Sequence, residues 1–61
     1  MLDVKIERLK QGLTQQDVAD KCGVIRQTIS NIECGVAKPS VDLAKKLGEV
    51  LKVDWTKFFA D

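Results

Sequence analysis

The chain has 61 residues, with ten basic and nine acidic side chains and a net charge of +1. This length supports one domain whose core contributes roughly 3–5 kcal/mol, so pairing with a second copy would add stability. An apolar fraction of 44% excludes a disordered chain. The balanced charge excludes a basic tail, so any contact with nucleic acid requires positioned groups rather than bulk charge.

The cysteines and the apolar runs argue against several classes of protein. Cys22 and Cys34 occur in a chain without histidine, so they cannot close a tetrahedral zinc site, and they match no redox motif. We expect two reduced thiols in a cytoplasmic protein. No apolar run approaches the ~18 residues of a membrane span. Charged residues interrupt the start of the chain, so no signal peptide is expected; they are Asp3, Lys5, Glu7 and Arg8.

The side chains that enzymes use in catalysis are largely absent. The chain lacks histidine and tyrosine, and its cysteines have no histidine partner. No serine has a nearby base, and the acidic residues are spread along the chain. We therefore expect no catalysis, no cofactor and no bound metal.

The first predicted helix covers residues 2–11. Leu2, Ile6 and Leu9 recur at i, i+4 and i+7, the spacing of an amphipathic helix. Gly12 follows, where a helix end favours a residue that tolerates positive φ.

A second helix is predicted to begin at Thr14. The Thr14 hydroxyl can accept from the amide of Asp17, and the Asp17 carboxylate can reach back in a shortened capping box. Val18 and Ala19 form the inner face, and the small Ala19 lets the next helix cross closely. Gly23 ends the helix.

The third predicted helix, at about residues 26–33, has a dry side and a polar side. Ile29 and Ile32 point inward, and Gly35 stops the helix. Its N-cap falls near Ile25, which lacks the side-chain acceptor that typically contributes ~1 kcal/mol. The polar side holds Arg26, Gln27, Ser30 and Asn31, whose hydrogen-bonding groups fit base edges. Such a helix, following a short turn, suggests a reader of duplex DNA.

Two more helices follow a loop at Pro39 and a new N-cap at Ser40. The fourth helix carries Val41, Leu43, Ala44, Leu47, Val50 and Leu51. Gly48 lies inside it at a cost of ~1 kcal/mol against alanine, which suggests a close backbone approach. A last short helix opens at Asp54 and places Trp55, Phe58 and Phe59 at i, i+3 and i+4. These aromatic residues belong either to the core or, where one or two protrude, to a dimer interface. The prediction is an all-α chain of five helices.

Several motifs occur together along nearly the whole chain. They are residues 12–19 (GLTQQDVA), Gly23-Val24, residues 26–33 (RQTISNIE), Gly35, Pro39-Ser40 and the Val53-Asp54 step. With them the chain resembles the Cro/CI-type, lambda-repressor-like helix-turn-helix family of bacterial and phage regulators. The resemblance implies one compact five-helix DNA-binding domain over residues 1–61, with the helix-turn-helix at about residues 14–34. It also implies sequence-specific DNA binding as a dimer, usually to repress transcription.

The resemblance also implies a role for individual residues. The third helix would enter the major groove, with Arg26 on guanine O6 and N7 and with Gln27 and Asn31 on adenine N6 and N7. Ser30 would face the bases beside them. Ile25 could touch a thymine methyl group, and Thr28 at the rim could serve packing or contact.

Further roles concern the DNA backbone and the bracing of the recognition helix. The expected phosphate contacts are Thr14, Gln15 and Lys38, with Gln15 at the positive end of the second helix's dipole. In the family, an arginine of the first helix pairs with a glutamate that ends the third helix. Arg8 and Glu33 occupy these positions.

Three departures from the family pattern bear on affinity. Cys34 replaces a common asparagine that contacts phosphate, Val36 and Ala37 replace basic residues, and Lys52 stands where glycine is usual. The first two departures remove contacts with the DNA backbone and leave Lys38 as the one basic residue in the loop after Gly35. We therefore expect modest affinity and a shallow salt dependence, because the slope falls by about one unit for each phosphate that the protein leaves unneutralised.

Two functions remain open at this point. The first is a regulator, expected to be a repressor, that binds a palindromic operator as a homodimer with half-sites about 34 Å apart. The alternative is a protein-interaction module of the same fold, antitoxin-like or an adaptor, with weak or no DNA binding. The near-neutral charge and the thinned basic loop after Gly35 favour the alternative.

Overall fold

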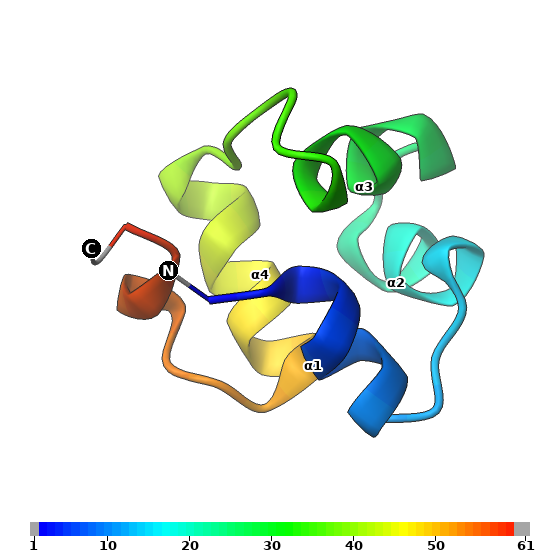
Figure 1. The fold of residues 1–61 in the computed structure, drawn as a ribbon, viewed down its shortest axis with the longest axis horizontal. Coiled ribbons are helices and arrows are strands. Elements are labelled where there is room, and N and C mark those ends of the chain that lie inside the picture. Colours follow the sequence, from blue (N-terminus) through cyan, green and yellow to red (C-terminus); the bar gives the residue numbers. More distant parts are fainter. Residues whose placement is uncertain (1, 60–61) are drawn as a thin grey trace.

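The computed structural model describes residues 2–59, so the expected domain, residues 1–61, extends beyond it at both ends. In chain order the elements are α1 (Val4–Lys10), α2 (Gln15–Cys22), α3 (Arg26–Glu33), α4 (Val41–Leu51) and a 3-10 turn, η1 (Trp55–Phe58). Short loops join the helices into one body (Figure 1). Over residues 2–59, none of the helices combines the length and apolar character needed to cross a membrane.

The last element is a short 3-10 helix, so the structure has four α-helices and one 3-10 turn where the sequence predicted five helices. The amide of Lys57 donates to the carbonyl of Asp54 at 3.0 Å, an i to i+3 bond. The Asp54 carboxylate accepts from the amide of Thr56 at 3.0 Å and from its hydroxyl at 2.7 Å. These local bonds hold the chain in the tighter 3-10 geometry instead of an α-helical turn.

α1 is shorter than predicted and buries a different face. Asp3 caps it, accepting from the amide of Ile6 at 3.2 Å. Its buried residues are Val4 and Arg8, whereas Ile6 is 51% exposed and Leu9 is 57% exposed. The apolar spacing therefore predicted a helix here but indicated the wrong core face. The reason is that a charged residue, Arg8, faces the interior together with a partner from α3.

α2 has the ends that the sequence predicted. The Thr14 hydroxyl accepts from the amide of Asp17 at 3.0 Å, and the Asp17 carboxylate accepts from the amide of Thr14 at 2.9 Å. This reciprocal capping box is the one expected. The helix ends at Gly23, whose φ of 71° is left-handed. Ala19 is fully buried, and α2 packs against α3.

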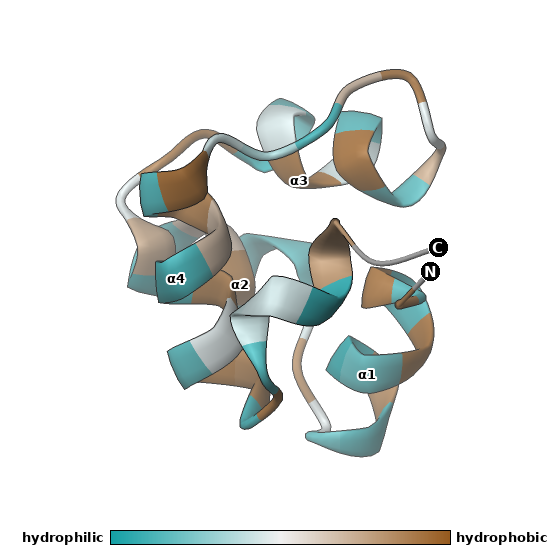
Figure 2. Cartoon of the chain, turned by 90° about the vertical axis from the view of Figure 1, so that its left-hand side faces the viewer, coloured by the Kyte–Doolittle hydropathy of each residue, from teal (hydrophilic) through white to brown (hydrophobic). Residues whose placement is uncertain are grey.

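The core lies between α2, α3 and α4 and is completed by one residue of η1 and one of α1. Its buried members are Val4, Val18, Ala19, Cys22, Ile29, Ala44, Leu47, Leu51 and Phe58. Figure 2 shows hydrophobic and hydrophilic residues alternating along α3 and α4, as one buried face on each helix requires. Ile32 is half-buried against this core, as predicted, but Val41 at the start of α4 is 51% exposed.

The end of α4 packs closely on η1. Gly48 is buried, and a Cβ at this position would lie 2.9 Å from the Cβ of Trp55 and 2.9 Å from the carbonyl oxygen of Val53. The predicted close backbone approach at Gly48 is therefore present. α4 ends at Lys52, which has a left-handed φ of 58° without being glycine.

Candidate nucleic-acid interface

The polar side of α3 faces solvent. Arg26 and Gln27 are exposed, and Ser30 and Asn31, one turn further along the same side, are half-buried. On the opposite side Ile29 is fully buried against the core. α3 lies at one edge of the molecule, beside α2 and away from η1 (Figure 1). The four residues expected to contact bases are thus brought together on one accessible strip.

Two side chains of this strip are joined to each other. Nε2 of Gln27 donates to Oδ1 of Asn31 at 2.9 Å. The side chain of Arg26 makes no hydrogen bond or ion pair with any residue in the described range 2–59. Its guanidinium donors therefore stay available for a ligand that presents acceptors.

The start of α3 differs from the starts of the other α-helices. Asp3, Thr14 and Ser40 each cap their helix with a side-chain oxygen, but Ile25 provides no such bond to α3. Ile25 is also 70% exposed. Thr28 is half-buried one turn later. An exposed apolar side chain therefore stands beside Arg26, where a capping residue would typically contribute ~1 kcal/mol.

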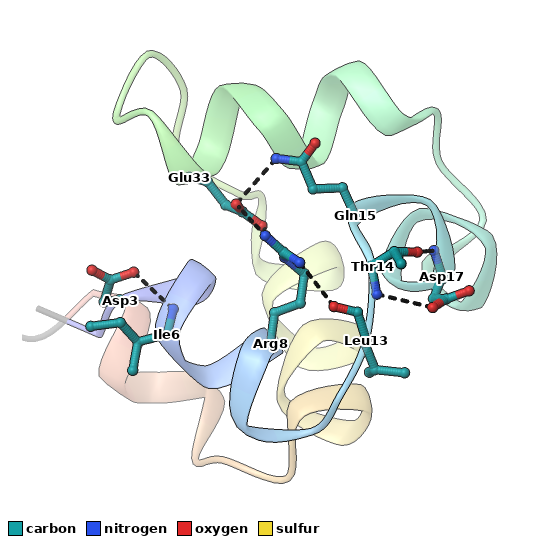
Figure 3. A network of polar contacts seen from close by, with 8 residues as sticks. All are labelled: Asp3, Ile6, Arg8, Leu13, Thr14, Gln15, Asp17 and Glu33. Carbon is teal, nitrogen blue, oxygen red and sulfur yellow. Dashed lines mark hydrogen bonds and ion pairs between the residues drawn. The ribbon is translucent and has the colours of Figure 1, made fainter.

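A buried ion pair braces α3 against α1. Nε of Arg8 donates to Oε2 of Glu33 at 2.7 Å, and Nη2 donates to Oε1 at 3.2 Å (Figure 3). The two side chains are 9% and 4% exposed. The pKa of Arg8 is raised, chiefly by its hydrogen bond to Glu33. Burial lowers this pKa, and the negative charge of Glu33 raises it further. The two-point contact fixes the relative orientation of the helices.

Two further groups join this ion pair. Nη1 of Arg8 donates to the carbonyl of Leu13 at 2.8 Å, which ties in the segment that leads into α2. Nε2 of Gln15, in the first turn of α2, donates to Oε1 of Glu33 at 3.2 Å (Figure 3). Glu33 therefore links α1, α2 and α3. Sequence reasoning missed the part played by Leu13, because a backbone carbonyl leaves no signal in side-chain identity.

The other residues expected to contact phosphate lie at the surface. Thr14 is exposed at the start of α2, close in sequence to Gln15. Lys38 is exposed in the loop that connects α3 to α4. Val36 in the same loop is 75% exposed, so an apolar side chain occupies a site where the family pattern has a cation.

The aromatic residues near the C-terminus divide between core and surface. Phe58 is 4% exposed and packs in the chain's own core, which is one of the two places expected for these aromatic residues. Phe59 is 45% exposed, and its ring lies edge-on to half-buried Trp55 at a centroid distance of 6.3 Å. Nζ of Lys45 lies 5.3 Å from the Trp55 ring centroid. Of the three aromatic residues, Trp55 and Phe59 lie on a surface that a second copy could contact.

The two cysteines occupy different environments. Cys22 is buried in α2, and burial raises the pKa of its thiol. Cys34 is exposed at the C-cap of α3, at the opposite end of the helix from Arg26 and Gln27.

Comparison with known proteins decides the family. The family model for the helix-turn-helix family matches residues 4–58 of this chain. The chain belongs to the helix-turn-helix family. This confirms the resemblance to Cro/CI-type regulators on which the residue roles were based.

Relatives of this helix-turn-helix domain include named transcriptional regulators. It is 47% identical over 58 residues to the HTH-type transcriptional regulator YqaF of Bacillus subtilis, covering 95% of this chain and 76% of YqaF. It is 46% identical over 50 residues to an HTH-type transcriptional regulator of Methanocaldococcus jannaschii, covering 82% of this chain and 76% of that protein. Among solved structures, the N-terminal DNA-binding domain of SinR from Bacillus subtilis superposes with a TM-score of 0.83. That pair is 27% identical, over 95% of this chain and 86% of the SinR domain.

Proposed function

We propose that this helix-turn-helix domain binds double-stranded DNA in a sequence-specific manner and represses transcription, with α3 in the major groove. The observation that carries the proposal is the solvent-facing strip of Arg26, Gln27, Ser30 and Asn31 on a helix braced from behind. The names of its relatives, and the DNA-binding function named for the SinR domain, support the same conclusion.

Base recognition would divide among the side chains of α3. Arg26 offers the paired donors that suit guanine O6 and N7, and the amides of Gln27 and Asn31 suit adenine. Each good two-point contact discriminates by roughly 1–3 kcal/mol. The exposed Ile25 would contact a thymine methyl group, and Ser30 would add a hydroxyl that can donate or accept.

Affinity would come from a small number of phosphate contacts. Thr14 and Gln15 begin α2, whose N-terminal amides favour a phosphate, and Lys38 provides a cation in the loop after α3. The exposed Val36 contributes none. A shallow salt dependence is expected, since the slope is about −0.9 per phosphate neutralised.

A homodimer on a palindromic operator completes the proposal. Trp55 and Phe59 are the aromatic residues available for contact with a second copy. Two copies related by a two-fold axis would place two α3 helices in successive major grooves about 34 Å apart. A dimer seated on a promoter in this way would exclude other proteins from the same DNA.

Selection of bound sequences from a random duplex pool tests the proposal. The expected result is an enriched palindrome, and Arg26→Ala combined with Gln27→Ala should abolish the specific shift while helical content is unchanged. Lys57→Ala, an exposed cation on η1, is the control and should bind normally. Phe59→Asp should shift sedimentation toward the monomer. Unchanged DNA binding by the double variant would refute the proposed reading face.

One observation favours the alternative of a protein-interaction module. Ile6 and Leu9 expose apolar surface on the outer face of α1, which the core does not use. Under this alternative the chain would co-elute with one stoichiometric protein and would not be retained by duplex DNA. Chromatography of the chain with and without a lysate, followed by mass spectrometry and duplex pull-down, separates the two functions.

A further inference from the structure

A hollow of about 290 Å³ lies where the start of α1, the loop after α3 and η1 meet. Its floor is apolar, because Val4 is 5% exposed, Phe58 is 4% exposed and Ile32 is half-buried. In Figure 1 the loop after α3 lies above the start of α1, with η1 to its left. Small-molecule sites in proteins begin at about 300 Å³, so the hollow has room for one ring or a short alkyl chain.

The loop that forms one wall of the hollow is held at both ends. The amides of Val36 and Ala37 donate to the carbonyl of Asn31 at 2.9 and 3.2 Å, which folds the loop back on the end of α3. Pro39, also in this wall, has its φ fixed by its ring. Ser40 follows and caps α4 with its hydroxyl. The hollow is therefore formed before a ligand binds, as most small-molecule sites are.

Three charged side chains line the hollow, and two of them are already compensated. Glu33 is neutralised by its ion pair with Arg8. The Asp3 carboxylate accepts from the amide of Ile6 at the start of α1, where the helix dipole offsets part of its charge. Lys38 is exposed and forms no ion pair within residues 2–59. An unpaired ammonium group beside an apolar floor suits a ligand that joins a carboxylate to a short apolar body.

We propose that the hollow binds a small apolar carboxylate, of the size of one aromatic ring, and that the bound ligand weakens DNA binding by engaging Lys38. Lys38 is also expected to contact a DNA phosphate, and one ammonium group cannot serve both anions fully. By linkage, the ligand and DNA then weaken each other's binding by the same factor. Ligand binding stands independently of the proposed function, whereas the effect on DNA rests on it.

A nuclear magnetic resonance titration of the whole chain with phenylacetate tests the site. Backbone signals of Ala37, Lys38 and Phe58 should shift, and those of α2, which contributes no residue to the hollow, should not. The small size of the probe predicts a Kd of about 1 mM. Phenylacetamide is the neutral analogue and 2-phenylethylamine the cationic one. Both should bind about 2- to 5-fold more weakly, the contribution of one exposed ion pair.

Substitutions in the wall locate the ligand and its charge. Lys38→Gln should remove the preference for the acid over the amide, and Lys38→Arg should keep it. Ala37→Leu enlarges an exposed side chain that lines the hollow, so it should weaken phenylacetate binding about 5-fold or more and leave DNA binding without ligand unchanged. The matched control is Val36→Leu, at a neighbouring residue that is 75% exposed and does not line the hollow. It should bind phenylacetate as the wild type does.

The effect on DNA is measured with an operator selected from a random duplex pool. Saturating phenylacetate should lower affinity relative to acetate at the same ionic strength. The slope of log affinity against log salt should become shallower by about 0.9, because one phosphate contact is lost. Lys38→Gln should have this shallower slope without ligand, and phenylacetate should change it no further.

The outcomes separate the site, its ligand class and its effect on DNA. The site is overturned if phenylacetate shifts no lining residue, or if Ala37→Leu binds it as tightly as the wild type. Tighter binding of 2-phenylethylamine would overturn the ligand class. Unchanged DNA affinity with phenylacetate bound would overturn the coupling while specific DNA binding stands. If the wild type enriches no operator, the proposed function fails, and the titration still decides the site.

Discussion

The ion pair between Arg8 and Glu33 gives the sharpest test of what holds the recognition helix in place. In Glu33→Gln the Arg8 guanidinium stays buried, at 9% side-chain exposure, but loses the carboxylate that neutralises it. Breaking a buried pair in this way costs about 3–5 kcal/mol. A core of this size provides only roughly 3–5 kcal/mol in total. Glu33→Gln should therefore be largely unfolded at 25 °C, or should melt at least ~12 °C below wild type.

Removal of both charges should behave differently. Arg8→Met combined with Glu33→Leu leaves no stranded charge, and such replacements are often neutral or stabilising by about 1–4 kcal/mol. Urea unfolding is followed by far-ultraviolet circular dichroism on the wild type, Arg8→Met, Glu33→Leu and the double variant. This cycle gives the coupling between the two residues. The expected signature is a double variant that is more stable than either single variant.

An exposed ion pair in the same helix provides the control. Nζ of Lys10 lies 3.2 Å from Oε2 of Glu7, and the Lys10 side chain is 64% exposed. Glu7→Gln should change the free energy of unfolding by no more than about 0.5 kcal/mol. If Glu33→Gln is as mild as Glu7→Gln, or if the double variant is as unstable as Glu33→Gln, the reasoning about the buried charge is refuted.

Three further predictions concern the helix ends. Lys52→Gly should raise stability by about 1 kcal/mol in urea unfolding, because φ is 58° at this residue and only glycine adopts it without strain; Lys52→Ala should give no such gain. Gly48→Ala should lower the melting temperature, since its Cβ would lie 2.9 Å from that of Trp55, and the cost of about 1–3 kcal/mol exceeds the gain in helix propensity. The hydrogen bond from the Thr14 amide lowers the pKa of Asp17. The ionised Asp17 carboxylate therefore stabilises the fold above about pH 4, and this stabilisation is lost as pH falls through the lowered pKa. Asp17→Asn should therefore lose less stability than the wild type as pH falls. If the urea midpoint of Asp17→Asn changes with pH as that of the wild type does between about pH 2 and 5, the result counts against the capping box.

The ends of α2 and the start of α4 were predictable because the groups that define them are close in sequence. The capping box of Thr14 and Asp17 and the left-handed Gly23 need only local hydrogen bonds and local φ angles. Ser40 similarly caps α4 by accepting from the amide of Leu43 at 3.2 Å. Such signals do not depend on how the helices later pack.

The sequence leaves the outcome open, or indicates the wrong one, where packing overrides local pattern. Ile6 and Leu9 have the spacing of a buried face but remain exposed, because Arg8 takes the interior position of α1. Phe58 and Phe59 are adjacent and chemically alike, yet one completes the core and the other lies at the surface. Asp54 opens a 3-10 turn where the sequence predicted a short fifth helix. Each outcome depends on what the segment meets in space.

The amino-acid sequence by itself determined the family, the order of the α-helices and the identity of the polar strip on α3, since each of these is written in short motifs. Only the tertiary structure decided which face of α1 is buried and how Glu33 joins three helices. The physical reason is distance along the chain: Arg8 and Glu33 are 25 residues apart, and their bond exists only after the helices have packed.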